Sequence, residues 1–503
     1  MNEPVHDPSA RRHNPIDRFR AKSHRLQIHP SEIVLLVVVS LHLVFIAWAF
    51  GGMRLWAQQI SFGLAAIGFV IALLPRNYTE EHSGLTPFRL YIWPKLIRFP
   101  LFWLGLAFLS LIVIQIYNPA WIYTLTPDKK GWFMADAAHI AWLPAGVSVP
   151  FNHGAGPVRA LLIYAAVWLT VCSAWIGFTR RRTLQFAFVV VAFNGFALAG
   201  LGLAQRFFPS PEMFWSWTPP ANNSFFASFI YKNHAAGYLN LTLAVACGLA
   251  GWFYLRGLRR LEKSNPAGLF VFIATTIAVS VLISYARGST IAMLTFLSLL
   301  IGIFLYQQIK APAEDRRPVV LGVLIIFFGV FLKTGLDALN SGQAWTRLSS
   351  AFSDSDGSFK ARQIATEASV DMLRDHWHSG VGAGGYRYLF PNYQQHYPEI
   401  FTVGGGRVFW EFAHNDWVQF PIEFGVPGIL LIVAMAGYLG GFMLKNRAWE
   451  NPLCASLLLG LGLTLAHARW EFLFYCPAIL LTACVVFALA ARWAEFEENN
   501  LRS

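Results

Sequence analysis

A histidine, an asparagine and an aspartate stand together at positions 414–416, where a polar segment gives way to a long apolar run. The surrounding stretch reads EFAHNDWVQFPIEFGVPGIL over residues 411–430. A histidine can accept a proton from a hydroxyl near neutral pH, so His414 is a candidate general base. Either Asp416 or Glu411 could orient it, although each is equally explained as a hydrated surface carboxylate. Polar groups near a lipid boundary are costly unless they are hydrated or functional, so the cluster is a candidate site.

Two arginines stand in settings that suit phosphate binding. Arg287 lies in SYARGSTIAM (284–293), a tight turn between two apolar runs. Arg362 lies on a predicted helix that has apolar residues at helical spacing, namely Ala361, Ile364, Ala365, Ala368 and Met372. A guanidinium is always charged and presents a planar fork to phosphate oxygens. From the residues alone, Arg287 is equally explained as a side chain that reaches to lipid headgroups, and Arg362 as a solvated helix residue.

Other motifs argue against metal or nucleotide chemistry. Gly380, Gly382 and Gly385 match GxGxxG, but they follow a predicted helix rather than a strand, so we interpret them as a turn packed closely against other backbone. His376 and His378 form an incomplete metal site, and the five cysteines contain no CxxC pair and are predicted to be buried thiols. We therefore expect no metal and no cofactor.

The elements that must position these residues are membrane helices. The chain has 503 residues, 55% of them hydrophobic and 13% charged, and apolar stretches recur from end to end. The fold class predicted is an all-α polytopic membrane protein with about 12 transmembrane helices and a large, partly helical extracytoplasmic loop. The predicted spans are 31–50, 55–74, 100–116, 158–178, 184–205, 235–255, 267–285, 289–306, 318–335, 422–443, 452–468 and 472–491.

The placement of Lys and Arg predicts the orientation. With both termini in the cytoplasm, the cytoplasmic segments hold 24 of these residues and the short opposite segments hold nine. The predicted organisation is a disordered basic tail (1–30), transmembrane helices 1–9 (31–335), a large periplasmic loop (336–421), helices 10–12 (422–491) and a cytoplasmic tail (492–503). The net charge of +12 follows from this topology and is weak evidence for nucleic-acid binding.

Polar and aromatic residues gather in the loops predicted to be extracytoplasmic, as in NPAWIYTLTPDKKGWF (118–133) and MFWSWTPP (213–220). Two interpretations of these rings remain open, an aromatic belt at the membrane interface and a surface that stacks on sugars. The spans themselves contain few ionisable groups, which disfavours the main alternative class, a lipid or polysaccharide transporter.

Four stretches, in order, resemble the O-antigen ligase and polymerase family. They are FIYKNHAAGYLNL (229–241), SYARGSTIAM (284–293), RQIATEASVDMLRDHWHSGVGAGGYRYLFPNYQ (362–394) and FAHNDWVQFPIEFGVPGIL (412–430). A weaker fifth, AHARWEFLFYCPA (466–478), is similar to the last extracytoplasmic turn of the family. The resemblance covers roughly residues 225–480, and residues 1–220 match only in hydropathy.

The resemblance implies a multi-spanning glycosyltransferase of the GT-C type in the bacterial inner membrane, with a periplasmic active site. Its donor would be a glycan linked to undecaprenyl pyrophosphate, and its acceptor a saccharide, either lipid A-core or a lipid-linked repeat unit. Mapped by motif, the catalytic residues would be Arg287, Arg362 and His414. The candidate substrate-binding residues are Asn233, His234, Arg347, Tyr386, Asn415 and Asp416, and Arg347 is close enough in sequence to Arg362 to share its role.

The expected reaction is a metal-independent, inverting glycosyl transfer with pyrophosphate as the leaving group. Arginines would stabilise the charge that develops on the leaving oxygen, and a histidine would accept the proton of the attacking hydroxyl. The resemblance implies an O-antigen ligase of lipopolysaccharide or surface polysaccharide biosynthesis, and the alternative is a polymerase that joins repeat units. A third branch of the family, which glycosylates proteins, shares the same motifs.

Overall fold

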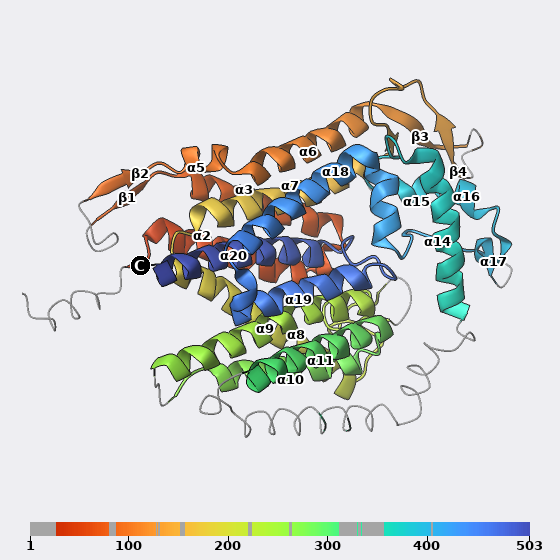
Figure 1. Cartoon of the computed structure of the whole chain (residues 1–503). Coiled ribbons are helices and arrows are strands. Elements are labelled where there is room, and N and C mark those ends of the chain that lie inside the picture. The colour runs from red at the N-terminus through yellow and green to blue at the C-terminus, as the bar shows by residue number, and fades with distance from the viewer. Residues whose placement is uncertain are drawn as a thin grey trace, which may run out of the picture.

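The structure is a computed structural model that describes residues 27–79, 87–126, 128, 131–150, 156–219, 224–260, 264–310, 329, 333, 357–403 and 406–502. Its helices run side by side across Figure 1 as one bundle. In this described part, nine helices are long and apolar enough to cross a membrane, and two shorter apolar helices accompany them. The protein is an all-α polytopic membrane protein, as the sequence predicts.

The eleven apolar helices correspond to eleven of the twelve predicted spans. The nine long ones are α2 (Pro30–Trp48), α3 (Leu55–Leu73), α6 (Pro100–Tyr117), α7 (Gly156–Gly177), α8 (Arg181–Phe207), α9 (Lys232–Arg260), α11 (Arg287–Lys310), α18 (Asp416–Lys445) and α20 (Pro477–Arg502). The two shorter ones are α10 (Ala267–Ile283) and α19 (Pro452–His467). The remaining predicted span, 318–335, lies outside the described residues apart from two isolated helical positions, and Arg347 lies outside them altogether.

Small residues let the helices approach closely, as is common where lipid supplies no hydrophobic force between helices. A Cβ on Gly195 of α8 would lie 2.2 Å from the hydroxyl of Thr242 on α9. A Cβ on Gly460 of α19 would lie 2.3 Å from that of Ala244, also on α9. Helix α20 is the most buried of the long helices and packs against α7, α18 and α19. These contacts fix α9 against α8 and α19, and α19 against α20.

The irregular segments divide between the two ends of the bundle (Figure 1). At the end shown on the right, which we call the loop end, lie α14 (Gly357–His376), α15 (Tyr386–Leu389), α16 (Pro391–Gln394) and α17 (Pro398–Phe401), together with β6 (Thr402–Val403) and β7 (Gly406–Arg407). The opposite end carries β1 (Arg76–Tyr78), β2 (Phe88–Leu90) and α5 (Trp93–Ile97). Two single turns, η1 (Phe50–Gly52) and η5 (Ala448–Glu450), connect helices.

The loop end also contains a three-stranded sheet that the sequence did not predict. Its strands are β3 (Pro119–Leu125), β4 (Trp132–Asp136) and β5 (Gly146–Ser148), in the order β4-β3-β5. Strand β4 is antiparallel to β3, with Tyr123 opposite Met134, and β5 is parallel to it. The sheet packs onto the Gly-rich stretch, because a Cβ on Gly382 would lie 2.5 Å from the Cα of Gly146.

The GxGxxG stretch is a backbone contact, as predicted. Helix α18 is broken at Gly425 (φ 60°, ψ −170°), and the freed backbone groups bond to this stretch. Val381 N donates to Ile422 O (2.8 Å) and Gly382 N to Glu423 O (3.0 Å). Gly380 has φ 72° and leaves no space for a Cβ beside Glu423 O. The glycines therefore attach the loop-end helices to the membrane helix that begins at Asp416.

Candidate functional site

A buried carboxylate, Glu471, connects three of the segments that carry candidate residues. It lies in the turn between α19 and α20, and its side chain is 1% exposed. Arg362 Nη1 lies 3.3 Å from Oε2, and His414 Nδ1 lies 2.9 Å from Oε1. Tyr231 OH donates to Oε2 (3.2 Å), and so does the side-chain amide of Asn233. We call these five residues the Glu471 cluster.

The charge state of Glu471 fixes the roles of its neighbours. Burial raises the pKa of this carboxyl, but the positive charge of Arg362 and the hydrogen bond from His414 outweigh burial and hold the pKa well below its usual range. An ionised carboxylate can only accept hydrogen bonds, so Nδ1 of His414 carries the hydrogen in this contact. The other ring nitrogen, Nε2, is then the basic atom of His414.

Tyr231 gives the cluster a second link. Its hydroxyl accepts from Arg362 Nη2 (2.9 Å) and from Asn233 Nδ2 (2.7 Å) while it donates to Glu471. Burial, followed by the negative charge of Glu471, raises the pKa of the Tyr231 hydroxyl, which therefore stays protonated. Arg362 is thus held by two acceptors in a fixed orientation, and its side chain remains 29% exposed.

Helix α14 positions Arg362. The apolar face predicted from its spacing is confirmed, because Ala365, Ala368 and Met372 are fully buried in the core of the loop end. This packing leaves Arg362 on the side of α14 that faces Glu471 and Tyr231. The helix contacts α18, the membrane helix that follows His414.

His414 occupies a left-handed backbone conformation (φ 51°), which is uncommon outside glycine. The following residues hold it there: Asp416 N donates to Ala468 O (2.9 Å), and Asp416 Oδ2 accepts from Phe474 N (2.9 Å). Asp416 therefore ties the start of α18 to the turn that contains Glu471. The imidazole packs edge-on against the ring of Phe472 at 4.7 Å and is 20% exposed.

The Asn233–His234 pair takes part in the same arrangement. Asn233 belongs to the Glu471 cluster, and Nε2 of His234 lies 3.1 Å from Phe472 O. The His234 ring is buried against Tyr231 and Phe472. This histidine therefore positions the turn that carries Glu471, and its side chain does not face open space.

Arg287 is the first residue of α11, and this helix starts beside the end of α19. A Cβ on the next residue, Gly288, would lie 2.4 Å from Nε2 of His467. Asn240 of α9 donates to Ser289 O (2.8 Å). The charges of Glu471 and Arg362 both act on His467. The structure therefore brings the start of α11 to the same end of the bundle as the Glu471 cluster.

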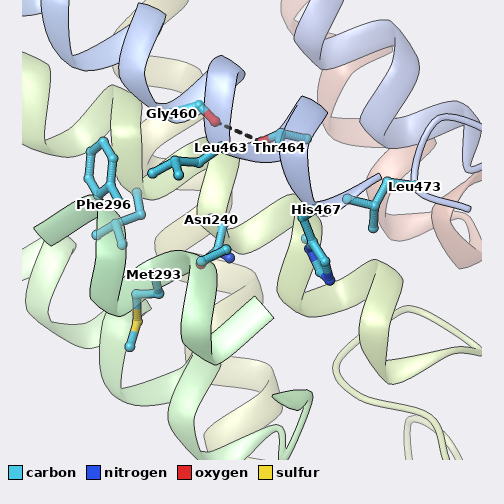
Figure 2. A pocket seen from close by; sticks show the side chains of 11 residues that line it. Asn240, Met293, Phe296, Gly460, Leu463, Thr464, His467 and Leu473 are labelled. Carbon is cyan, nitrogen blue, oxygen red and sulfur yellow. Dashed lines mark hydrogen bonds between the residues drawn. The ribbon is translucent and has the colours of Figure 1, made fainter. Parts of the chain in front are cut away.

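A small cavity lies between α9, α11 and α19 next to this cluster. Most of its wall is apolar, and Figure 2 shows Asn240 and His467 contributing polar groups to it. The lining residues are Gly237, Asn240, Leu243, Ala292, Met293, Phe296, Gly460, Leu463, Thr464, His467 and Leu473. His467 and Leu473 lie four residues before and two residues after Glu471 in the sequence, so the cavity adjoins the turn that carries this carboxylate.

The other predicted binding residues are buried. Tyr386 is fully buried, with its hydroxyl 2.9 Å from that of Ser369, and Asp416 holds a backbone amide. Asn415 is fully buried, and within the described ranges neither polar atom of its side-chain amide has a hydrogen-bond partner. In this structure these three side chains face the protein interior.

The expectation that Asp416 or Glu411 orients His414 is wrong. Glu411 pairs with Arg387, and Asp416 bonds to the backbone, so the orienting carboxylate is Glu471. Sequence reasoning recognised AHARWEFLFYCPA as a loop-end turn but did not single out its glutamate. It also missed Tyr231, two residues before Asn233. The available signal was a carboxylate in an otherwise aromatic turn between two apolar helices.

The part of the chain that the structure describes contains no evident metal-binding site. There, no three His, Cys, Asp or Glu side chains are grouped so that they could hold a metal ion. Nε2 of His376 lies 3.0 Å from Tyr393 OH, and burial lowers the pKa of this histidine.

The fold and site together define a polytopic helical membrane protein with arginines and a carboxylate-paired histidine at one end of the bundle. Residues 269–433, from α10 into α18, match the family model described as O-antigen ligase. This segment is therefore similar to the O-antigen ligase family, and the match supports the resemblance found in the motifs. No curated protein matches the chain. The match contains Arg287, Arg362 and His414, and it supports a membrane enzyme of the O-antigen ligase and polymerase type.

Proposed function

We propose that the protein transfers a glycan from undecaprenyl pyrophosphate to an acceptor hydroxyl at the periplasmic face of the bacterial inner membrane. The observation that carries this proposal is the meeting of Arg362 and His414 on one buried carboxylate, Glu471. A phosphate-binding group and a general base are thereby fixed relative to each other, which a displacement reaction requires.

His414 acts as the base in this mechanism. Glu471 holds the Nδ1–H group, and Nε2 takes the proton of the acceptor hydroxyl as its oxygen attacks the anomeric carbon. The bond from this carbon to the pyrophosphate oxygen breaks, and undecaprenyl pyrophosphate leaves with the bonding electrons. A single displacement of this kind inverts the anomeric centre. Glu471 also stabilises the imidazolium that forms.

Arg362 and Arg287 stabilise the leaving group. Negative charge grows on the pyrophosphate oxygen in the transition state, so guanidinium groups placed beforehand lower the barrier without a metal ion. Arg362 is paired with Glu471 in this structure, and an arriving pyrophosphate competes with the carboxylate for its N–H groups. Binding of the donor is thereby coupled to the carboxylate that orients the base.

His414→Asn and His414→Gln test the role of the base. Either amide can keep a structural hydrogen bond, but neither takes up a proton near neutral pH. We expect both variants to lose about 10²–10⁴-fold in transfer rate, as much as His414→Ala, while lipid-linked donor still binds. The matched control is His396→Ala, at an exposed histidine of the loop end. Near-normal transfer by His414→Asn at equal expression would reduce His414 to a structural residue.

The acceptor decides between ligase and polymerase, and we propose the ligase. Purified protein is incubated with lipid-linked repeat units alone, and in parallel with lipid-linked glycan plus lipid A-core. The ligase reaction gives glycosylated lipid A-core and no lengthening of the lipid-linked chains. Longer lipid-linked chains in the first incubation would show a polymerase instead.

A further inference from the structure

Three arginines from distant parts of the sequence form a second charged group at the loop end. Arg54 follows η1, Arg159 lies in the first turn of α7, and Arg387 lies in α15. Arg159 Nε donates to Gln58 Oε1 (2.9 Å), and its Nη2 donates to Met53 O. Arg159 is thereby fixed beside Arg54. We call Arg54, Arg159 and Arg387 the outer arginine cluster.

The carboxylate of Glu411 lies beside two of these arginines, Arg387 and Arg159. Glu411 accepts a hydrogen bond from Arg387 Nη1, and the charges of Glu411, Arg387 and Arg54 all act on Arg159. Neither Arg54 nor Arg159 is ion-paired within the described ranges; the guanidinium of Arg54 lies 5.3 Å from the ring centre of Trp217. The three arginines and one glutamate leave an excess of two positive charges.

The arginines that carry this excess charge are partly shielded from water. Arg387 is 28% exposed, and its guanidinium lies over the rings of Tyr388 (5.3 Å) and Phe409 (5.5 Å). Its Nε is buried and has no hydrogen-bond partner among the residues that the structure describes. Placing like charges together in a partly dehydrated site is unfavourable, and an unmet N–H group adds to the cost. A bound anion removes both costs. The arrangement therefore has the charge and the donors of an anion site.

Aromatic rings line the same place. The ring of Tyr123 lies 4.8 Å from that of Tyr388 and stacks on Trp132 at 5.0 Å. Burial raises the pKa of the Tyr388 hydroxyl, and the charges of Arg387 and Arg159 act on this group. Rings beside cationic groups suit a sugar that carries a negative charge, because the rings cover its apolar face and the arginines hold its anionic group.

The outer arginine cluster adjoins the Glu471 cluster through the segment 409–414. Glu411 is three residues before His414, and the ring of Trp410 packs edge-on against the imidazole at 5.6 Å. Arg362 contacts Glu471, whereas Arg387 contacts Glu411. In this series of contacts His414 stands between Arg362, an arginine suited to the donor pyrophosphate, and a second cationic group that the donor does not require.

We infer that the outer arginine cluster binds an anionic group, either a phosphate or a sugar carboxylate, on the acceptor saccharide. This inference rests on the proposed function, because it assigns the second substrate to the side of His414 away from Arg362. The acceptor is then an acidic or phosphorylated saccharide. Arg387 and Arg54 select it, and its hydroxyl is brought to Nε2 of His414.

The experiment measures thermal unfolding of the full-length protein in detergent with small probes. Glucose 6-phosphate and glucuronate are the two anionic sugars, glucose is the neutral control, and inorganic pyrophosphate tests the donor site. The variants are Arg387→Gln, Arg54→Gln and Arg362→Gln. Arg374→Gln serves as a control at an exposed arginine paired with Asp371.

We expect at least one anionic sugar, but not glucose, to raise the unfolding midpoint of the wild type, Arg362→Gln and Arg374→Gln. Its affinity should fall about tenfold or more in Arg387→Gln and Arg54→Gln, as the loss of a charge-assisted hydrogen bond requires. The sugar that binds identifies the anionic group as phosphate or carboxylate. Pyrophosphate should still stabilise Arg387→Gln, which also shows that this variant is folded.

Two results would overturn the inference: no shift with either anionic sugar, or equal shifts in the wild type, Arg387→Gln and Arg54→Gln. Failure of the proposed function looks different. Pyrophosphate would then leave the wild type unchanged, or would stabilise Arg362→Gln as strongly as the wild type, whatever the sugars do.

Discussion

Glu471→Gln is the substitution that tests the site most directly. Glutamine keeps the size of glutamate but replaces an ionised acceptor with an amide that has one acceptor oxygen and two N–H donors. At this position the amide faces donors from Arg362, His414, Tyr231 and Asn233. At least one N–H group of the new side chain must therefore point at another donor.

The expected loss of stability follows from burial. Removing one partner of a buried ion pair costs about 3–5 kcal/mol, because the other charge is left without compensation. Glu471 is 1% exposed, but Arg362 is 29% exposed and is partly hydrated when it loses its partner. We therefore expect Glu471→Gln to lower the free energy of unfolding by about 3 kcal/mol, the low end of this range.

The same variant should lose the acid sensitivity that Glu471 gives the wild type. Arg362 and His414 lower the pKa of the Glu471 carboxyl in the folded protein despite its burial. A carboxyl with a lowered folded pKa stabilises the protein above its unfolded pKa, about 4.3, and this contribution is lost as pH falls below that value. The stability difference between wild type and Glu471→Gln should therefore be full at neutral pH and shrink below about pH 4.

Unfolding in detergent, followed from neutral to acid pH, measures the free energy of unfolding of the two proteins. The rate of glycan transfer measures whether Glu471 acts through His414. If Glu471 acts by orienting His414, the double variant Glu471→Gln/His414→Gln should be no slower than the worse single variant. Arg374→Gln, which breaks an exposed ion pair, is the control for charge loss at the loop end. Additive losses in the double variant, or a stability difference that stays constant into acid, would refute the reasoning.

Four further outcomes are expected. Arg287→Lys should lose most transfer activity at unchanged expression, because lysine lacks the planar fork of a guanidinium. Transfer at the wild-type rate would mean that Arg287 only reaches to the lipid headgroups. EDTA should leave transfer intact, and a loss restored by Mg²⁺ or Mn²⁺ would contradict the metal-independent mechanism. Arg374→Cys, made in a protein that lacks the five native cysteines, should be labelled by an impermeant thiol reagent in intact spheroplasts. Labelling only after lysis would reverse the predicted topology. Gly382→Ala should lower the free energy of unfolding in detergent by about 1–3 kcal/mol, because the new Cβ meets the backbone of Gly146. Gly63→Ala is the control and should lower it less, because the new Cβ there has open space around it. Equal losses in the two variants would mean that the Gly-rich contact is unimportant.

The helical bundle was predictable because a bilayer leaves a chain few options. Backbone groups in lipid must bond within their own segment, so each apolar stretch of sufficient length forms a helix. Eleven helices appear where hydropathy placed them, and the face of α14 formed by Ala365, Ala368 and Met372 is buried as its spacing predicts. The glycine motif was also interpreted correctly, since a position after a helix excludes a dinucleotide turn.

The sequence likewise identified the candidate site residues. Arg287, Arg362 and His414 were singled out from their residue types, their places beside apolar runs and the resemblance to the motifs of a family. The strands β3, β4 and β5 were not found. Their sheet packs at Gly146 against Gly382, a contact between residues 236 apart in the sequence. The alternation of apolar and polar residues in these short strands is too weak to show such a distant contact.

Only the tertiary structure decided how the site is assembled. Glu471 is 57 residues from His414 and 109 from Arg362, and spacing in the sequence gave no reason to prefer it over Glu411 or Asp416 as the partner of the imidazole. Packing of α9, α19 and α20 brings Tyr231 and Asn233 to the same carboxylate. A buried charge must find its compensating donors wherever the fold supplies them. The sequence therefore determined which groups are available, and the close packing of the helices decided which carboxylate holds the histidine.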